Sequence, residues 1–374
     1  MTLRIFHTAD LHLSRDAAAY GLEVLADLVY RCRLLEADAW VLSGDIFDTP
    51  ADAESMAEDL VGNLSELKGL PIVMIPGNHE LAGGAAPRTL APLATRLAPT
   101  VHLILDEPFG IHRPEHPEFE VLGVPFQRQY ENFSEWQAPP KSRRWRVGLL
   151  HGVVNGLTHT GESEEEEHGV IDPHLFERLE LDYAALGHIH AGREARLGPC
   201  LAHYPGSARV WRRGESGPRR AALAIFDDDG VRTEEVPIEA AGQYVELGIP
   251  LDEDGAPLEH DSPEALLGAV ANGRGGQDWL RLELTGFVES SSSVETLQRH
   301  LLRLGQGQFR RFEVESAVVE AEGLRGHPLV RAFNAAWTPR HSQARASGDA
   351  AEMDLLSRAR RQALEEIHRR LQEG

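Results

Sequence analysis

Apolar runs and amphipathic stretches alternate along the chain from Met1 to about Asp106. Four short apolar runs have the length and composition of buried strands, and they lie at 4–8, 39–42, 72–75 and 101–105. Three stretches carry apolar residues at helical spacing, at 16–35, 52–67 and 88–97. Strands that alternate with helices form parallel sheets joined by crossover helices. The pattern therefore predicts an α/β domain.

Between about residues 109 and 238 the apolar runs are mainly strand-like, and Gly and Pro turns separate them. Examples lie at 120–124, 201–204 and 221–226. The sequence Asp227-Asp228-Asp229-Gly230 predicts a hairpin turn before a further strand at 231–236. We expect these strands to form a second sheet that stacks on the first.

The strand and helix alternation restarts near Gly242. Strand-like runs at 244–249, 279–284 and 312–319 alternate with helical patterns at 263–270 and 294–304, which predicts a small β-α-β-α-β unit. Beyond residue 322 the composition changes, and Ser347-Gly348 precedes an amphipathic helix over 351–371. We expect three parts: a main domain over 1–240, a small α/β capping domain over 241–322 and a C-terminal helical segment over 323–374.

Polar residues suited to metal binding follow five of the predicted strands. They are Asp10 and His12, Asp45 and Asp48, Asn78 and His79, His151, and His188 and His190. In open α/β sheets ligands bind beyond the carboxyl ends of the strands, where a polar side chain points into a cleft. We therefore expect these side chains to gather at one edge of a sheet.

Asp, Asn and His without Cys suit Mn²⁺, Fe²⁺ or Zn²⁺ better than a thiolate-bound structural zinc. The two cysteines, Cys32 and Cys200, lack Cys-x-x-Cys spacing, and we expect both in the core. Two neighbouring ions need a shared ligand, and the carboxylate of Asp45 can bridge them with its two oxygens. Such a pair activates water and stabilises charge on a phosphorus centre, so hydrolysis of a phosphate ester is the reaction that fits.

The motif order D-x-H, G-D-x-x-D, G-N-H-E, H-G and G-H-x-H resembles the calcineurin-like metallophosphoesterase superfamily. The resemblance implies an α/β fold in which helices flank a two-sheet sandwich. On the family's assignments one metal would be held by Asp10, His12, Asp45 and His190. The other would be held by Asp45, Asn78, His151 and His188. His79 would contact the phosphate and assist the leaving oxygen, and Asp48 would face the substrate or support the ligands.

Within the superfamily the chain is most similar to the SbcD family of bacterial DNA-repair exonuclease subunits. The stretches that carry this resemblance are 6–13, 44–49, 182–190 and 204–207, and it covers about the first 240 residues. It implies a Mn²⁺-dependent 3′-to-5′ exonuclease and single-strand endonuclease that works as a dimer. It also implies C-terminal helices that dock on the coiled coil of an SbcC-like ATPase. Glu80 departs from the pattern, since related nucleases more often have Asp there.

The formal net charge of −22 argues against tight unaided binding to nucleic acid, which depends on Lys and Arg. Basic clusters nevertheless occur at 141–146 and 209–213, and each contains a Trp that could stack on a base. The second cluster follows a Pro-Gly-Ser stretch, which makes Arg209, Trp211 and Arg212 candidate DNA contacts. Either cluster could instead be a solvated strand edge.

Two other functions remain open. One is an enzyme that acts on a small phosphodiester or phosphomonoester; the other is a non-catalytic scaffold whose metal holds the fold. The complete ligand set with His79 argues against the scaffold, because a structural site has no use for an open position. The sequence contains no apolar run long enough to cross a bilayer, and the first predicted strand begins close to Met1. We therefore expect a cytoplasmic protein.

Overall fold

The computed structural model describes residues 2–82, 87–126, 135–157, 169–320 and 326–373. The chain divides into two compact units, Met1–Gln243 and Tyr244–Gly374. The expected division into three parts, with boundaries at residues 240 and 322, stays a prediction.

The first unit contains a six-stranded sheet in the order β15-β14-β1-β2-β3-β4. Its strands are β1 (Leu3–Thr8), β2 (Ala39–Ser43), β3 (Ile72–Ile75), β4 (His102–Leu103), β14 (Arg220–Asp227) and β15 (Gly230–Pro237). β1 to β4 pair in parallel, as the alternating pattern predicts. The hairpin of β14 and β15 extends this sheet, because β14 pairs antiparallel with β1. The expectation that it joins the second sheet is therefore wrong.

The second sheet has the order β11-β12-β10-β7-β6-β5. Its strands are β5 (Gly110–His112), β6 (Phe119–Val124), β7 (Trp145–His151), β10 (Tyr183–Gly187), β11 (Arg193–Leu197) and β12 (Cys200–Tyr204). β6, β7, β10 and β12 are parallel, and β5 and β11 form antiparallel edges. Three shorter strands lie outside this sheet: β8 (Val153–Val154), β9 (Val170–Ile171) and β13 (Gly217–Pro218).

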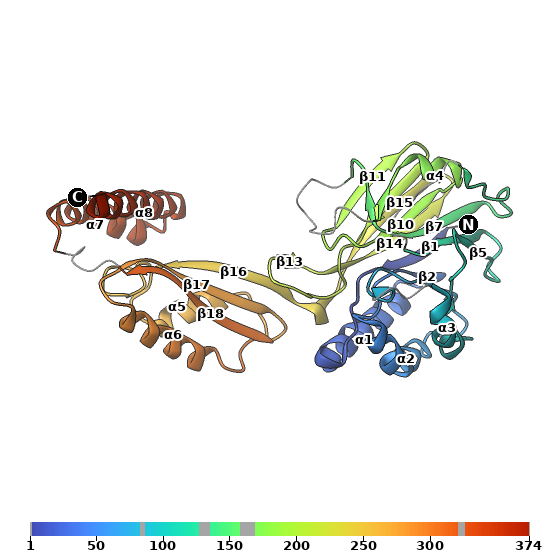
Figure 1. Cartoon of the computed structure of the whole chain (residues 1–374), viewed down its shortest axis with the longest axis horizontal. Helices are drawn as coiled ribbons and strands as arrows, with labels where there is room; N and C mark the ends of the chain where they lie inside the picture. Colours follow the sequence, from blue (N-terminus) through green and yellow to red (C-terminus); the bar gives the residue numbers. More distant parts are fainter. Residues whose placement is uncertain (1, 83–86, 127–134, 158–168, 321–325, 374) are drawn as a thin grey trace. The chain divides into compact units, whose positions relative to one another are not determined.

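Helices cover the outer faces of the two stacked sheets (Figure 1). They are α1 (Ala18–Leu34), α2 (Pro50–Leu64) and α3 (Ala91–Leu97) on the first sheet and α4 (His174–Arg178) on the second, with short 3-10 turns at Arg15–Ala17, Pro87–Leu90 and Glu239–Ala241. α2 begins where its sequence dictates, since the Thr49 hydroxyl accepts from the Asp52 N–H at 3.1 Å and Pro50 starts the helix.

The side chains of each central strand alternate between two cores, as strand geometry requires. In β2, Trp40 packs with the helices, whereas Val41 packs between the sheets against residues such as Val147 and Tyr183. All four are fully buried. The molecule thus has the predicted two-sheet sandwich flanked by helices, and the strand ends that carry the polar motifs are held by two hydrophobic cores.

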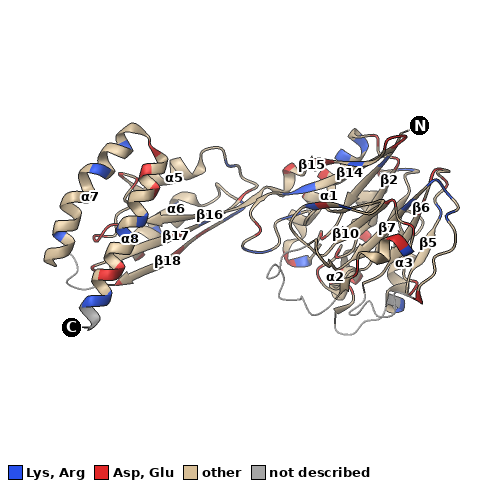
Figure 2. Ribbon diagram, turned by 90° about the horizontal axis from the view of Figure 1, so that it is seen from above, with Lys and Arg blue, Asp and Glu red and all other residues tan. Residues whose placement is uncertain are grey.

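The second unit contains three parallel strands and two crossover helices, as predicted. They are β16 (Gln243–Pro250), α5 (Pro263–Ala271), β17 (Trp279–Val288), α6 (Ser291–Gly305) and β18 (Arg311–Glu320). Two helices follow, α7 (Pro328–Ser347) and α8 (Ala350–Glu373), of which the sequence predicts only the second. Acidic and basic residues line α8 (Figure 2). Among them, Arg358 forms an ion pair with Asp354 at 2.8 Å. Over the described parts of the chain, no helix is both long and apolar enough to cross a membrane.

Candidate metal centre

The predicted ligands meet at the ends of five strands that belong to two different sheets. Asp10 and His12 follow β1, Asp45 and Asp48 follow β2, Asn78 and His79 follow β3, His151 ends β7, and His188 and His190 follow β10. The first three strands are in one sheet and the last two are in the other. The prediction of a single sheet edge is therefore wrong: the residues gather where the ends of two sheets meet.

Four of these residues have a left-handed backbone, which is uncommon for residues other than Gly. Their φ angles are +54° at Asp10, +47° at His12, +50° at Asp45 and +98° at His188. The loops hold one another in place, because the N–H of Asp10 donates to the Gly44 carbonyl at 3.1 Å and that of His12 to the Asp45 carbonyl at 2.9 Å. Backbone strain of this kind concentrates at functional sites, where the surrounding structure enforces it.

One group of metal-binding atoms comes from Asp45, Asn78, His151 and His188. The Oδ1 atom of Asn78 lies 2.9 Å from His151 Nε2 and 3.0 Å from His188 Nδ1. Asp45 Oδ2 lies 3.3 Å from the same His151 nitrogen. His151 Nδ1 donates to the Ser43 carbonyl at 2.7 Å, and because a carbonyl can only accept, Nε2 is the nitrogen that faces the group.

A second group comes from Asp10, His12 and His190. The Nε2 atoms of the two imidazoles face each other at 3.1 Å, and His190 Nε2 lies 3.9 Å from Asp10 Oδ1. The other nitrogen of His190 pairs with the carboxylate of Glu215. A carboxylate on the far nitrogen fixes the orientation of a metal-binding imidazole.

Burial is the largest influence on the ionisation of these groups. It lowers the pKa of His12 to about 4 and that of His188 to about 3, so both offer a lone pair at neutral pH. It raises the pKa of Asp10 to about 6. For Asp45 and His151, burial is outweighed by the attraction between the two side chains. His151 holds the pKa of Asp45 well below its usual range, and Asp45 raises the pKa of His151 to about 9. A histidine binds a metal only as neutral imidazole, so a metal ion at His151 would have to displace a proton.

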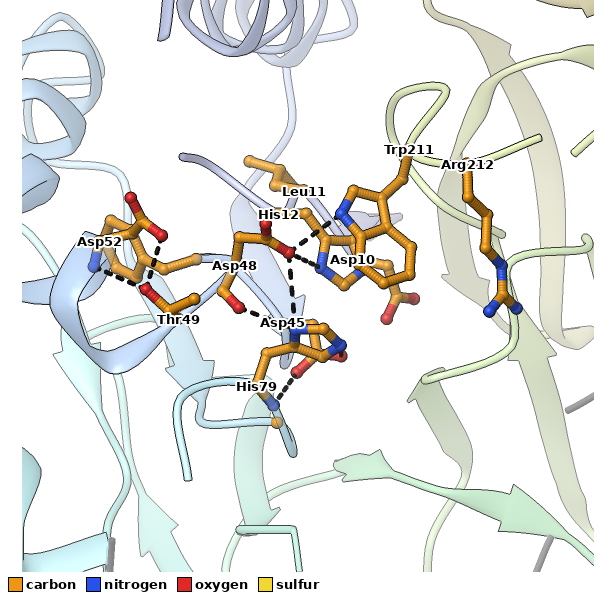
Figure 3. A network of polar contacts seen from close by, with 12 residues as sticks. Asp10, Leu11, His12, Asp45, Asp48, Thr49, Asp52, His79, Trp211 and Arg212 are labelled. Carbon is orange, nitrogen blue, oxygen red and sulfur yellow. Dashed lines mark hydrogen bonds and ion pairs between the residues drawn. The ribbon is translucent and has the colours of Figure 1, made fainter. Parts of the chain in front are cut away.

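His79 and Asp48 lie beside the second group (Figure 3). His79 Nδ1 donates to the Asp48 carbonyl at 2.8 Å, which directs His79 Nε2 toward Asp45 Oδ2, 4.0 Å away. Asp48 Oδ1 lies 3.5 Å from Nδ1 of both His12 and His79. The His79 side chain is 22% exposed, so it is partly accessible from solvent.

Glu80 supports the loops of the site, a role that the sequence did not predict. From the sequence it stood out only as a departure from the family pattern. Its Oε2 atom accepts from the N–H groups of Asp45 at 3.1 Å and Gly77 at 2.8 Å, and Oε1 accepts from Phe47 at 2.7 Å. Burial, with the nearby charge of Asp45, raises the pKa of Glu80 to about 7. One buried carboxyl group thus joins the loops after β2 and β3.

The three candidate DNA contacts lie in different surroundings. Arg209 is 5% exposed, and its guanidinium donates to the Leu11 carbonyl at 2.8 Å and also to the His12 carbonyl. Trp211 stacks on the His12 ring, with centroids 4.2 Å apart, while the Arg212 side chain is 55% exposed. The first two side chains order the loop after β1; that any of the three contacts DNA stays a prediction.

The other basic cluster is partly a core feature. Arg146 is fully buried and donates to Glu120 at 2.8 Å, and to the carbonyls of Leu179 and Pro139. Lys141 pairs with Asp182 at 2.6 Å. Arg146 is therefore unavailable to a nucleic acid.

The residues present suit a pair of hard or borderline divalent ions. The two groups offer imidazole nitrogens and carboxylate oxygens with no thiol, and Asn78 adds an amide oxygen. A carbonyl orients His151 and a carboxylate orients His190, each from its far nitrogen. This arrangement of oriented imidazoles is typical of metal ligands rather than of core histidines.

Comparison with known proteins agrees with this chemistry. A model of the family described as calcineurin-like phosphoesterase matches residues 3–192. The SbcD subunit of the SbcCD nuclease from Bacillus subtilis is 26% identical over 339 aligned residues, which cover 79% of this chain and 82% of that protein.

Two further matches are more distant. The "Uncharacterized metallophosphoesterase YhaO" of Bacillus subtilis is 24% identical over 249 residues, covering 58% of this chain and 56% of that protein. Among solved structures, the purple acid phosphatase PPD1 of yellow lupin seeds aligns with a TM-score of 0.46 and 12% identity, covering 65% of this chain and 53% of that one.

Proposed function

Because the chain belongs to the calcineurin-like phosphoesterase family, we propose that it is a dinuclear-metal phosphodiesterase that hydrolyses DNA. The observation that carries the proposal is the convergence of five strand ends on two groups of metal-binding atoms. We assign Asp10, His12, Asp45 and His190 to one ion, and Asp45, Asn78, His151 and His188 to the other. Asp45 is the assigned bridge.

Two bound divalent ions, which we take to be Mn²⁺, would supply Lewis-acid activation of both the water and the phosphoryl group. The chain's own residues set the geometry for that chemistry. His79 Nε2 faces Asp45 Oδ2, 4.0 Å away, because the Asp48 carbonyl accepts from Nδ1. In this position His79 contacts a phosphate oxygen and gives a proton to the leaving oxygen, a task suited to imidazole. Asp48 keeps His12 and His79 in place rather than reacting itself.

DNA is the proposed substrate because of the match to the SbcD protein of the SbcCD nuclease, which extends over both units of this chain. On the same ground we propose 3′-to-5′ exonuclease and single-strand endonuclease activity in DNA repair, in a dimer that assembles with an SbcC-like ATPase. Arg212 is the most accessible of the proposed DNA contacts, since its side chain is 55% exposed.

The test is digestion of end-labelled linear duplex and single-stranded DNA with Mn²⁺, against an EDTA control. Asn78→Ala removes an oxygen that faces two imidazoles and should abolish digestion. Asn63→Ala is the matched control, because the Asn63 amide donates to the Asp59 carbonyl within α2. Digestion that persists in Asn78→Ala would contradict the assigned site.

A second candidate is hydrolysis of a small phosphodiester or phosphomonoester. The net charge of −22 favours it, because a DNA-binding surface gains affinity from Lys and Arg. Hydrolysis of bis(p-nitrophenyl) phosphate without any digestion of DNA, both by the chain alone and with the ATPase present, would support this candidate and refute the nuclease.

For the ATPase we propose docking on the C-terminal helices, where Leu329 of α7 and Leu355 of α8 are 55% and 52% exposed. Leu355→Asp should prevent co-purification with an SbcC-like ATPase while Mn²⁺-dependent hydrolysis persists. Leu302→Asp on α6, also an exposed Leu, is the control and should leave co-purification intact. Co-purification that survives Leu355→Asp would place the contact elsewhere.

A further inference from the structure

The segment from Trp211 to Glu215 lies beyond the residues that the family model matches, yet it reaches into the metal centre. The Glu215 side chain is 7% exposed and forms an ion pair with His190 Nδ1 through Oε1. Its other oxygen accepts from the Trp211 N–H at 2.9 Å. The Glu215 carboxylate therefore connects the proposed ligand His190 to the backbone of the loop that carries Glu215.

Trp211 makes the second connection. Its indole stacks on the His12 ring, with centroids 4.2 Å apart and an angle of 11° between the planes. Its Nε1–H donates to Asp48 Oδ1 at 3.0 Å, which fixes the ring over His12 (Figure 3). The pair Trp211 and Glu215, which we call the 211–215 brace, thus contacts both imidazoles of the group that comes from Asp10, His12 and His190.

The loop that carries the brace has anchors besides the Glu215 carboxylate, which itself lies 3.9 Å from Arg219 and 3.6 Å from Arg212. Arg219 is 6% exposed and donates to the carbonyls of Glu215 at 3.0 Å, Ser216 at 2.9 Å and Gly217 at 3.1 Å. It also donates to the Ser207 hydroxyl at 3.1 Å. A conservative change of the Glu215 side chain therefore leaves these anchors in place.

The group that comes from Asp45, Asn78, His151 and His188 is supported differently. The far nitrogen of His151 meets the neutral carbonyl of Ser43, whereas that of His190 meets the anionic carboxylate of Glu215. An anionic partner increases the basicity of the imidazole and its affinity for a cation, and outer partners of this kind change metal affinity by about 10–100-fold. The two ligand groups therefore differ in the charge of the partner behind one imidazole, and a substitution of Glu215 changes that charge in one group alone.

We propose that Glu215, through the 211–215 brace, is a positioning residue that sets the metal affinity of the Asp10, His12 and His190 group without affecting the other group. The inference rests on the metal assignment of the proposed function. Glu215→Gln keeps the shape of the side chain and an acceptor oxygen but removes the charge. It should weaken one Mn²⁺ site by about 10–100-fold and leave the other unchanged.

The experiment is a Mn²⁺ titration of the full chain, followed by electron paramagnetic resonance. Wild type should bind two ions and show the spectrum of a coupled pair at saturation. Glu215→Gln should show an isolated Mn²⁺ over an extended range of concentration before the coupled spectrum appears. Glu235→Gln is the matched control, since that exposed carboxylate pairs only with Arg220 among the described residues, and it should titrate as wild type.

The outcomes separate the two proposals. Two ions bound by Glu215→Gln with wild-type affinities, or both sites weakened equally, would overturn the role of Glu215 while the dinuclear site stands. A wild-type chain that binds no Mn²⁺ would refute the proposed function itself and, with it, this inference. Circular dichroism in EDTA reports whether the variant folds. Should Glu215→Gln unfold, Glu215→Asp, whose shorter side chain withdraws the carboxylate from His190 Nδ1, must show the same site-selective weakening, and wild-type titration would overturn the proposal.

Discussion

Removal of the Glu80 carboxyl group should destabilise the first unit more than the loss of one side chain on the surface would. Glu80 is 1% exposed and accepts three backbone N–H groups, from Asp45, Phe47 and Gly77, at 2.7–3.1 Å. In Glu80→Ala these donors have no acceptor in the protein. The loops after β2 and β3 would lose their shared connection.

The magnitude follows from the number of donors. Each buried group left without its partner costs about 1–3 kcal/mol. Water that enters the space left by the side chain reduces this cost, so we use the lower half of the range. Three donors at about 1–2 kcal/mol each then give a loss of about 3–6 kcal/mol in the free energy of unfolding. Glu80→Gln keeps one acceptor oxygen and should fall between wild type and Glu80→Ala.

Urea unfolding in EDTA measures this loss without a contribution from bound metal. The midpoint should fall while the slope of the transition stays constant, which indicates a change in stability alone. Glu58→Ala is the control. That side chain is 89% exposed, and its ion pair with Arg96 is long at 4.0 Å. Exposed ion pairs of this kind contribute little to stability, so the midpoint should change little. A loss below about 1 kcal/mol for Glu80→Ala would refute the reasoning, since it is less than the cost of a single donor.

Other substitutions test other parts of the centre. His79→Leu should keep its Mn²⁺ content and lose about 10²–10⁴-fold in kcat, because it removes a proton donor and not a ligand. Asp45→Ala should lose bound Mn²⁺, and equal metal content in these two variants would contradict the bridging role. Gly187→Ala would place a methyl group against the Ser43 carbonyl oxygen and 2.8 Å from a His151 nitrogen, so it should cost about 1–3 kcal/mol in urea unfolding. Gly62→Ala in α2 meets nothing within 4 Å and should instead stabilise the fold by about 0.5–1 kcal/mol; equal effects of the two Gly substitutions would contradict the steric argument.

The strands and the ligand motifs could be predicted because both depend on local sequence. An apolar run such as Ala39–Ser43 forms a strand wherever it is buried, and the polar residue after it must lie at the strand's end. Strand pairing depends on distant residues and is harder to predict. The apolar run of β14 could extend either sheet, and only the pairing with β1 decides which.

α7 illustrates another limit of the sequence. It contains Pro339, which removes a backbone donor and disfavours a helix interior. Packing stabilises the helix in spite of this, with Val330 fully buried beside Phe287 of β17 and Leu364 of α8. Helical stability of this kind comes from tertiary contacts that local propensity does not report.

Like strand pairing and α7, the burial of charged side chains could not be predicted from the sequence. Glu80, Glu215 and Arg146 are ordinary polar residues in the sequence, and most residues of these types are solvated. Their burial depends on partners far along the chain, such as Glu120 for Arg146 and His190 for Glu215. The residues that would touch the metal could be found from motifs, whereas the groups that hold them in place required the fold.

The central claim is that two metal ions share Asp45, and anomalous diffraction from a crystal grown with Mn²⁺ tests it most directly. We predict two peaks about 3.5–4 Å apart, one beside His12 and His190 and one beside His151 and His188, with an oxygen of Asp45 touching each. A single peak, or two peaks of which one does not contact Asp45, would contradict the account.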